Sequence, residues 1–242
     1  MFWAILCLVA GAQAQSQLMR PDIERKVDSV LALMTLEEKV GQLNQHTGSF
    51  DVTGPRPAEG SAAERYDLVK RGGVGSMLNV VGAKATREAQ RLAVENSRLG
   101  IPMIFGYDVI HGYKTIFPVP LAESASWDLE AIETSARIAA TEATAAGLHW
   151  TFAPMVDVGR DARWGRVMEG AGEDPYLGAR IAVARIDGFQ TNDLANLESM
   201  AATAKHFAGY AFAESGREYN TAEISKNTLM NSILFETNRT RN

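Results

Sequence analysis

Short apolar runs alternate with longer segments of helical periodicity four times along this chain of 242 residues. The apolar runs, which predict strands, cover residues 74–81, 102–109, 150–156 and 200–207. The helical segments that follow them cover residues 86–99, 128–146, 175–189 and 225–235. Such an alternation predicts an α/β protein, in which helices connect parallel strands and cover the sheet.

Two folds fit this pattern, a doubly wound sheet and a (β/α)8 TIM-type barrel. Asp108, Asp157 and the pair Lys205 and His206 come at the ends of successive apolar runs, where barrels build their active sites from several strands. A dinucleotide-binding sheet would need a glycine fingerprint after its first strand, and the Gly-Val-Gly at 73–75 precedes that strand and lacks the third glycine. The sequence therefore predicts a barrel. Because a full barrel has eight such units, we expect only about its first half.

Two helices are predicted before the first apolar run. Apolar residues recur at helical spacing over residues 21–35, and Pro21 suits a first helical turn. Thr35 and Glu38 have the spacing of a capping box and predict a second helix over residues 35–43. Residues 47–60 are rich in Gly, Pro, Ser and Asp and predict a loop.

The first residues have the pattern of a secretory signal. An apolar run over residues 2–12 leads into Ala12-Gln13-Ala14, a small-x-small cleavage pattern, and the run is too short to span a bilayer. We expect residues 1–14 to be a signal peptide, residues 15–242 to be a partial barrel domain, and the protein to be secreted or periplasmic. An ordinary buried strand or helix start is the alternative. Cleavage there would remove Cys7, the only cysteine, and with it any disulfide or thiolate chemistry.

Composition argues against two classes of partner. The net charge is −5, and the 22% of charged residues include no dense basic run. Nucleic acids and anionic membranes are bound through basic faces, so neither is an expected partner.

The first candidate site segment follows the second apolar run. A carboxylate at a strand end, such as Asp108, can accept two hydrogen bonds from neighbouring sugar hydroxyls. Tyr107 and Tyr113 are placed to pack on the apolar face of a sugar ring. The alternatives are a turn-capping role for Asp108 and a packing role for His111.

Two further segments carry polar side chains after later strands. Arg163, Trp164, Arg166 and Glu169 lie in a Gly-rich loop and could clamp a polyhydroxyl ligand, because Arg binds oxygen atoms through two donors at once. The alternative is a solvated charged loop. Lys205 and His206 offer adjacent hydrogen-bond donors at the fourth strand end.

Other chemistries fit less well. Five residues could in principle form a metal site, but they are scattered and no HxH or HExxH pattern occurs: Asp108, His111, His149, Asp157 and His206. The sequence also lacks the GxSxG elbow of serine hydrolases. We expect neither a metal nor a cofactor. Asp157 and Glu169 could form a local carboxylate pair, although no spacing requires it.

Several motifs together resemble the N-terminal barrel domain of glycoside hydrolase family 3, closest to the periplasmic β-glucosidases. They occur in the family's order from about Pro21 to Thr221. The motifs are Met-Thr-Leu-Glu-Glu-Lys-Val-Gly-Gln-Leu at 34–43, the stretch 108–128, Asp-Ala-Arg-Trp-Gly-Arg at 161–166 with Glu169, Glu-Asp-Pro at 173–175 and Lys-His-Phe at 205–207. Ala162 replaces the family's usual proline, which changes loop stiffness but removes no polar contact.

The resemblance implies a retaining, exo-acting hydrolase that removes β-linked glucose, or a close relative such as xylose, from β-glucosides or oligosaccharides. It implies that Asp108, Arg166, Lys205 and His206 hold the sugar next to the scissile bond and that Glu169 fixes the arginine. It implies no cofactor and assigns no oligomeric state.

Retaining glycosidases use two carboxyls about 5–5.5 Å apart. In the family, the nucleophile lies on a later barrel strand and the acid/base in a following domain. We therefore expect no catalytic residue among these 242 and no activity from them alone. Residues 227–242 depart from the family's pattern, and we expect a truncation or frameshift there. The alternatives are a non-catalytic sugar-binding fragment and a gene remnant.

Overall fold

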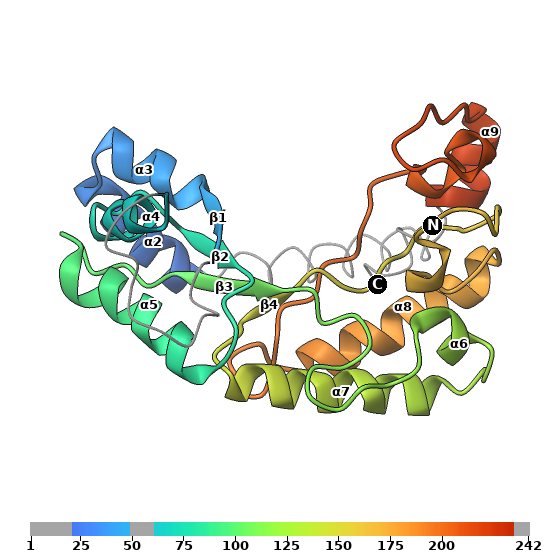
Figure 1. Cartoon of the computed structure of the whole chain (residues 1–242), viewed down its shortest axis with the longest axis horizontal. Helices are drawn as coiled ribbons and strands as arrows, with labels where there is room; N and C mark the ends of the chain where they lie inside the picture. Colours follow the sequence, from blue (N-terminus) through green and yellow to red (C-terminus); the bar gives the residue numbers. More distant parts are fainter. Residues whose placement is uncertain (1–20, 49–60, 235–242) are drawn as a thin grey trace, which may run out of the picture.

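The computed structural model describes residues 21–48 and 61–234, so the predicted signal at 1–14 lies outside the described residues. Four short strands form one parallel sheet in the order β1-β2-β3-β4 (Figure 1). They are β1 Gln45–Thr47, β2 Ser76–Leu78, β3 Ile104–Tyr107 and β4 Trp150–Thr151. Each strand lies next to its neighbour in sequence, as in a barrel wall, whereas a doubly wound sheet reverses its order part-way. The predicted fold, an α/β chain that forms about the first half of a barrel, is confirmed.

Helices connect the strands and form an outer layer. Figure 1 shows α5, α7 and α8 following one another along one side of the sheet, and α4 packs against α5. The α-helices are α2 Pro21–Leu33, α3 Leu36–Leu43, α4 Ser61–Lys70, α5 Ala83–Asn96, α6 Pro120–Ser124, α7 Leu129–Ala145, α8 Pro175–Gln190 and α9 Lys226–Thr228. Short 3-10 turns cover Val167–Glu169, Tyr210–Phe212 and Glu214–Gly216. Across 21–48 and 61–234, no helix has the length and apolarity that crossing a membrane requires.

The core lies between the sheet and this helical layer. Met77 and Phe105, which are 0% and 1% exposed, project from β2 and β3. They pack in one cluster with Leu92 of α5 and with alanines of α7. Large side chains from short strands therefore meet small ones from the long helix, which lets the helix lie close to the sheet.

The strand prediction differs from the structure in two places, an additional strand and an interrupted one. Strand β1 was not predicted, because its three polar residues give no apolar pattern and form a strand only by pairing with the edge of β2. The apolar run at 200–207 forms isolated parallel bridges, Trp150 to Ala201 and Met155 to Lys205, in place of a continuous strand. These bridges still place the end of that run beside the carboxyl ends of the other strands.

The two helices predicted before the first apolar run are confirmed as α2 and α3. Thr35 Oγ1 accepts a hydrogen bond from the Glu38 backbone at 3.2 Å, and Glu38 Oε2 accepts one from the Thr35 backbone at 2.9 Å, so the capping box is present. The predicted helix over 225–235 is shorter, because α9 passes into a wider π turn at Leu229–Ile233.

Helices α7 and α8 approach closely through small residues. A Cβ atom added at Gly188 of α8 would lie 2.4 Å from the Glu133 carbonyl oxygen and 2.7 Å from Ala136 Cβ on α7. Both distances are shorter than van der Waals contact, and the first partner is rigid backbone. The interface between these helices therefore requires glycine at 188.

We predict that Gly188→Ala lowers the free energy of unfolding by about 1–3 kcal/mol, because the helices must separate to admit the methyl group. Urea denaturation followed by circular dichroism measures the change. Gly165→Ala is the matched control, since an added Cβ there meets nothing within 4 Å. Equal stability of the two variants would show that the interface is not tight.

A buried ion pair joins α6 and α8 to the segment after β3. Arg185 and Glu123 are 3% and 9% exposed, and their side chains form a salt bridge. Arg185 also donates to the Ile110 carbonyl oxygen at 2.8 Å. Burial lowers the pKa of Arg185, and the Glu123 carboxylate acts against this shift. The pair therefore fixes the backbone two residues beyond Asp108.

Removing one charge should leave the other buried without its partner. We predict that Arg185→Met costs about 3–5 kcal/mol of unfolding free energy. Arg163→Met is the control, because Arg163 forms its salt bridge with Asp161 at the surface, where its side chain is 71% exposed, and such pairs contribute at most about 1 kcal/mol. Chemical denaturation of both variants measures the difference, and similar losses would contradict the structural role of the buried pair.

Candidate active site

Six polar side chains meet beyond the carboxyl ends of β3, β4 and the 200–207 segment. We call them the polar cluster: Asp108, Asp157, Arg166, Glu169, Lys205 and His206. They come from three strand ends and one loop, and each carboxylate contacts a basic side chain. Parallel strands place their carboxyl ends at one edge, which is why residues 97 positions apart, Asp108 and Lys205, can pair.

Asp108 and Lys205 form the more open part of the cluster. The Lys205 Nζ lies 3.1 Å from Asp108 Oδ1, and the two side chains are 14% and 48% exposed. The backbone after Asp108 is fixed, since the Val109 N–H donates to Thr151 Oγ1 at 3.2 Å. The Asp108 carboxylate is thus held at its base, while half of its surface remains accessible to a ligand.

His206 is oriented by the buried Asp157. Asp157 Oδ2 accepts from the His206 backbone N–H at 3.0 Å and lies 2.8 Å from the ring Nδ1. A carboxylate accepts here, so the proton is assigned to Nδ1. The other nitrogen, Nε2, then acts as an acceptor and lies 3.4 Å from Nη1 of Arg166.

Arg166 is held by Glu169 through two parallel hydrogen bonds. Nε and Nη2 of Arg166 each lie 2.7 Å from an oxygen of Glu169, which is three residues further along the turn at Val167–Glu169. The hydrogen bonds to Arg166 hold the pKa of Glu169 below its usual range, and the charge of Lys205 adds to this effect. The Glu169 carboxylate in turn raises the pKa of Arg166. Both groups are therefore charged at neutral pH.

Three residues that the sequence grouped with this site lie outside the cluster. Arg163 bonds to Asp161, and the structure shows no contact between it and the cluster. Trp164 is 1% exposed and packs beneath the Tyr210 ring. His111 Nδ1 lies 3.0 Å from the Phe117 carbonyl oxygen and closes a loop. Trp164 thus packs in the interior and His111 holds a loop, and neither belongs to the cluster.

Two cluster neighbours were not assigned a role from the sequence. The sequence offered Asp157 as a strand-end residue, a metal candidate and a possible partner of Glu169, whereas in the structure it pairs with His206. The signal for this pairing is the equivalent place of the two residues at the ends of adjacent apolar runs. Tyr210 was not singled out, and its ring contacts both Arg166 and His206. No spacing pattern in the sequence indicates that contact.

The described residues offer no obvious metal site. Within 21–48 and 61–234, no three His, Cys, Asp or Glu side chains are grouped to hold a metal ion. His149, which the sequence placed among metal candidates, accepts instead from the Phe105 N–H at 3.2 Å through Nδ1.

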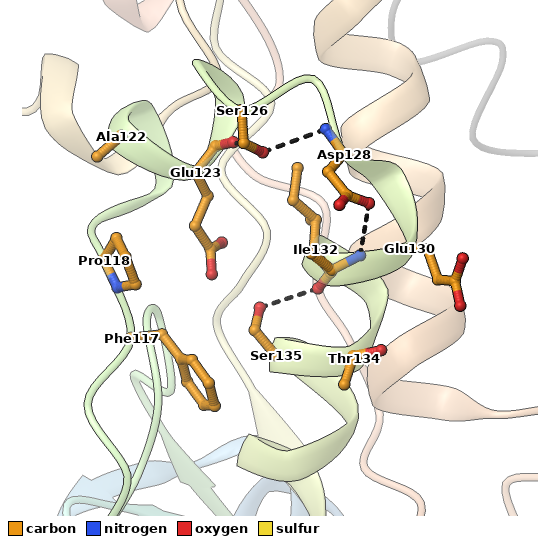
Figure 2. A pocket seen from close by; sticks show the side chains of 11 residues that line it. Phe117, Pro118, Ala122, Glu123, Ser126, Asp128, Glu130, Ile132, Thr134 and Ser135 are labelled. Atoms are coloured by element: carbon orange, nitrogen blue, oxygen red, sulfur yellow. Dashed lines mark hydrogen bonds between the residues drawn. The ribbon is translucent and has the colours of Figure 1, made fainter.

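A cavity of about 550 Å³ lies apart from the polar cluster, between α6, the loop before it and the first turns of α7 (Figure 2). Figure 2 shows Glu123, Phe117 and Ser135 among its lining side chains. The cavity is on the helical layer, and Asp128 at its edge caps α7. The cavity therefore belongs to the packing between helices of the outer layer and not to the polar cluster.

Comparison with known proteins gives consistent results. The glycosyl hydrolase family 3 N-terminal domain model matches residues 35–237. A periplasmic β-glucosidase of Salmonella typhimurium is 39% identical over 208 residues, which cover 86% of this chain and 26% of that protein. A putative β-xylosidase of Formosa agariphila is 32% identical over 224 residues, which cover 87% of this chain and 30% of that protein.

A solved structure agrees with these relatives. The crystal structure of a β-glucosidase from Listeria innocua in complex with glucose has a TM-score of 0.81 and 42% identity, and the match covers 89% of this chain and 31% of that one. The chain thus spans about a quarter to a third of the length of these proteins, 26% to 31%. Since the match of residues 35–237 takes in most of the chain and the fold agrees, this chain belongs to glycosyl hydrolase family 3.

Proposed function

We propose that this chain supplies the sugar-recognition part of a retaining, exo-acting β-glucosidase, which hydrolyses O-glycosyl bonds at the non-reducing ends of β-glucosides. The observation that carries the proposal is the polar cluster, in which Asp108, Arg166, Lys205 and His206 converge from two strand ends and one loop. The names of the similar proteins support it, since two are β-glucosidases and one of these was solved with glucose.

The cluster has the donors and acceptors that a sugar requires. The Asp108 carboxylate accepts from two neighbouring hydroxyls, while the ammonium of Lys205 and the guanidinium of Arg166 donate to hydroxyl oxygens. His206 Nε2 accepts once Nδ1 has donated to Asp157. Because ion pairs already order these side chains, sugar binding would require little further loss of side-chain entropy.

The cluster carboxylates are less suited to breaking the glycosidic bond. A general acid in a retaining glycosidase requires a raised pKa, whereas Arg166 lowers the pKa of Glu169. Asp157 is 6% exposed and is occupied by His206. We therefore assign sugar binding to Asp108, Arg166, Lys205 and His206, with Glu169 in support, and no bond-breaking role to any of them.

A second candidate is sugar binding without hydrolysis by these 242 residues alone. The favouring observation is that the cluster is held together entirely by contacts within the described residues, such as Asp157 with His206 and Glu169 with Arg166. The two candidates share the same binding residues and differ only in whether bond cleavage follows.

We also propose that the protein is exported, with residues 1–14 as the signal. The apolar run and the small-x-small pattern at 12–14 support this, as does the periplasmic location in the name of the Salmonella relative.

Sugar recognition predicts that glucose raises the melting temperature of the 242-residue chain. Asp108→Ala should weaken glucose binding by about 10- to 100-fold, because hydrogen bonds to a charged group are lost. Calorimetric titration measures the dissociation constant, and Asp161→Ala, at the exposed pair, is the control that should bind normally. No stabilisation by glucose would contradict recognition by this chain.

Hydrolysis is tested in the same preparation with an aryl β-glucoside. We expect no nitrophenol from the 242-residue chain, because its cluster carboxylates are paired with basic groups. Release that disappears in Asp108→Ala would show instead that these residues complete the reaction.

The Arg166–Glu169 pair predicts an acid-dependent loss of stability. Because the folded pKa of Glu169 is lowered from 4.5, its contribution is present above that value and is lost as pH falls through the lower folded pKa. The melting-temperature difference between the unsubstituted chain and Glu169→Gln should shrink from about pH 6 to about pH 3. Glu223→Gln, at an exposed loop residue, should show little difference throughout. A Glu169→Gln difference that stays constant with pH would refute the pairing.

A further inference from the structure

One aromatic ring lies against both Arg166 and His206. Tyr210 begins the 3-10 turn Tyr210–Phe212, four positions after His206. The two rings meet edge to face, with centroids 4.7 Å apart and an angle of 79°. The guanidinium carbon of Arg166 lies 5.6 Å from the centre of the Tyr210 ring, within the range of a cation–π contact.

The ring is supported from below by Trp164. The Trp164 and Tyr210 rings pack edge to face at 5.3 Å, and Trp164 is 1% exposed. Met155 and Ala211 complete this small apolar cluster. Tyr210 therefore has a rigid base and cannot move away from Arg166 and His206 without opening the cluster.

The hydroxyl end of Tyr210 is fixed by Glu218. The Tyr210 O–H donates to Glu218 Oε1, and the other oxygen, Oε2, is buried without a partner among the described residues. The segment that carries Glu218 is itself held closely, because a Cβ at Gly216 would lie 2.8 Å from the Trp164 backbone nitrogen. Gly216 also has a φ of +66°, which favours glycine.

We infer that Tyr210, anchored through its hydroxyl to Glu218, is a positioning residue for the sugar-binding side chains Arg166 and His206. Glu169 fixes the edge of the guanidinium and Tyr210 fixes its face, which directs Nη1 toward His206. Asp157 fixes one ring nitrogen of His206, and Tyr210 restricts rotation of that ring. The inference rests on the proposed function for its link to sugar, although the ordering of the two side chains is independent of sugar.

Two kinds of substitution distinguish the effect of the Tyr210 ring contacts from the effect of its hydrogen bond to Glu218. Tyr210→Leu removes the ring contacts, whereas Tyr210→Phe removes only the hydrogen bond between residues 210 and 218. Glu218→Ala removes the same hydrogen bond together with a carboxylate charge that acts on Arg166. Glu218→Gln also removes that charge but keeps an oxygen that accepts from the tyrosine hydroxyl, so it should bind glucose more tightly than Glu218→Ala. Tyr176→Leu, at an exposed tyrosine at the start of α8, is the control.

The first measurement is made without sugar, by nuclear magnetic resonance of the 242-residue chain. We expect one protected Arg166 Nε–H signal and a single His206 tautomer protonated at Nδ1, retained in the Tyr176→Leu control. In Tyr210→Leu, the Arg166 signal should lose protection and His206 should populate both tautomers. Unchanged signals in a folded Tyr210→Leu would overturn the inference.

The second measurement is the glucose dissociation constant by calorimetry. We expect it to rise about 10-fold or more in Tyr210→Leu, and about 3- to 10-fold in Tyr210→Phe and in Glu218→Ala. The double variant Tyr210→Phe/Glu218→Ala should bind as Glu218→Ala does, because Glu218→Ala has already removed the hydrogen bond that Tyr210→Phe removes. Additive losses in the double variant, or normal binding in both single variants, would overturn the anchoring role even if Tyr210→Leu does not fold.

The two measurements distinguish the inference from the proposed function. If the unsubstituted chain does not bind glucose but Tyr210→Leu disorders Arg166 and His206, sugar recognition by this chain fails and positioning by Tyr210 stands. If the unsubstituted chain binds glucose and folded Tyr210→Leu binds equally well with unchanged signals, sugar recognition stands and the positioning role is overturned.

Discussion

Parallel hydrogen bonding between the segment after β4 and residues 201–205 determines where the polar cluster forms. The Val156 N–H donates to the Lys205 carbonyl oxygen at 2.6 Å, and the Lys205 N–H donates to the Pro154 carbonyl oxygen at 3.1 Å. This register brings the His206 backbone N–H to 3.0 Å from the Asp157 carboxylate. A shift of residues 201–206 by one position would turn the His206 side chain to the other face and break its pair with Asp157, and with it the acceptor geometry of His206 Nε2.

Each carboxylate of the cluster has a partner. Three carboxylates, Asp108, Asp157 and Glu169, each contact a basic side chain, Lys205, His206 and Arg166 respectively. A site whose charged groups already have partners suits an uncharged ligand such as a sugar, because binding leaves no charge without a partner. The half-exposed Asp108 is the point at which hydroxyl groups can enter without disrupting the buried Asp157–His206 pair.

The sequence predicted those features of the fold that are determined by residues close together in the chain. The capping box of Thr35 and Glu38 and the alternation of strands and helices both follow from neighbouring residues. The order of the motifs also allowed the cluster residues to be named. Strand β1 could not be predicted, because Gln45–Thr47 is polar and extended only through its partner β2. The burial of Trp164 and the contacts of Tyr210 depend on how the segment around Gly216 folds back, which no local pattern encodes.

The burial of the Arg185–Glu123 pair implies that the two ends of the candidate site respond differently to dissolved salt. Ions screen exposed charges strongly and buried ones little. The Arg163–Asp161 pair, with its arginine 71% exposed, loosens as ionic strength rises, whereas Arg185, 4% exposed at its side chain, keeps its hold on the backbone beyond Asp108. In a concentrated salt solution, the loop that carries Arg166 would thus gain freedom at its tip while the strand end that carries Asp108 remains fixed.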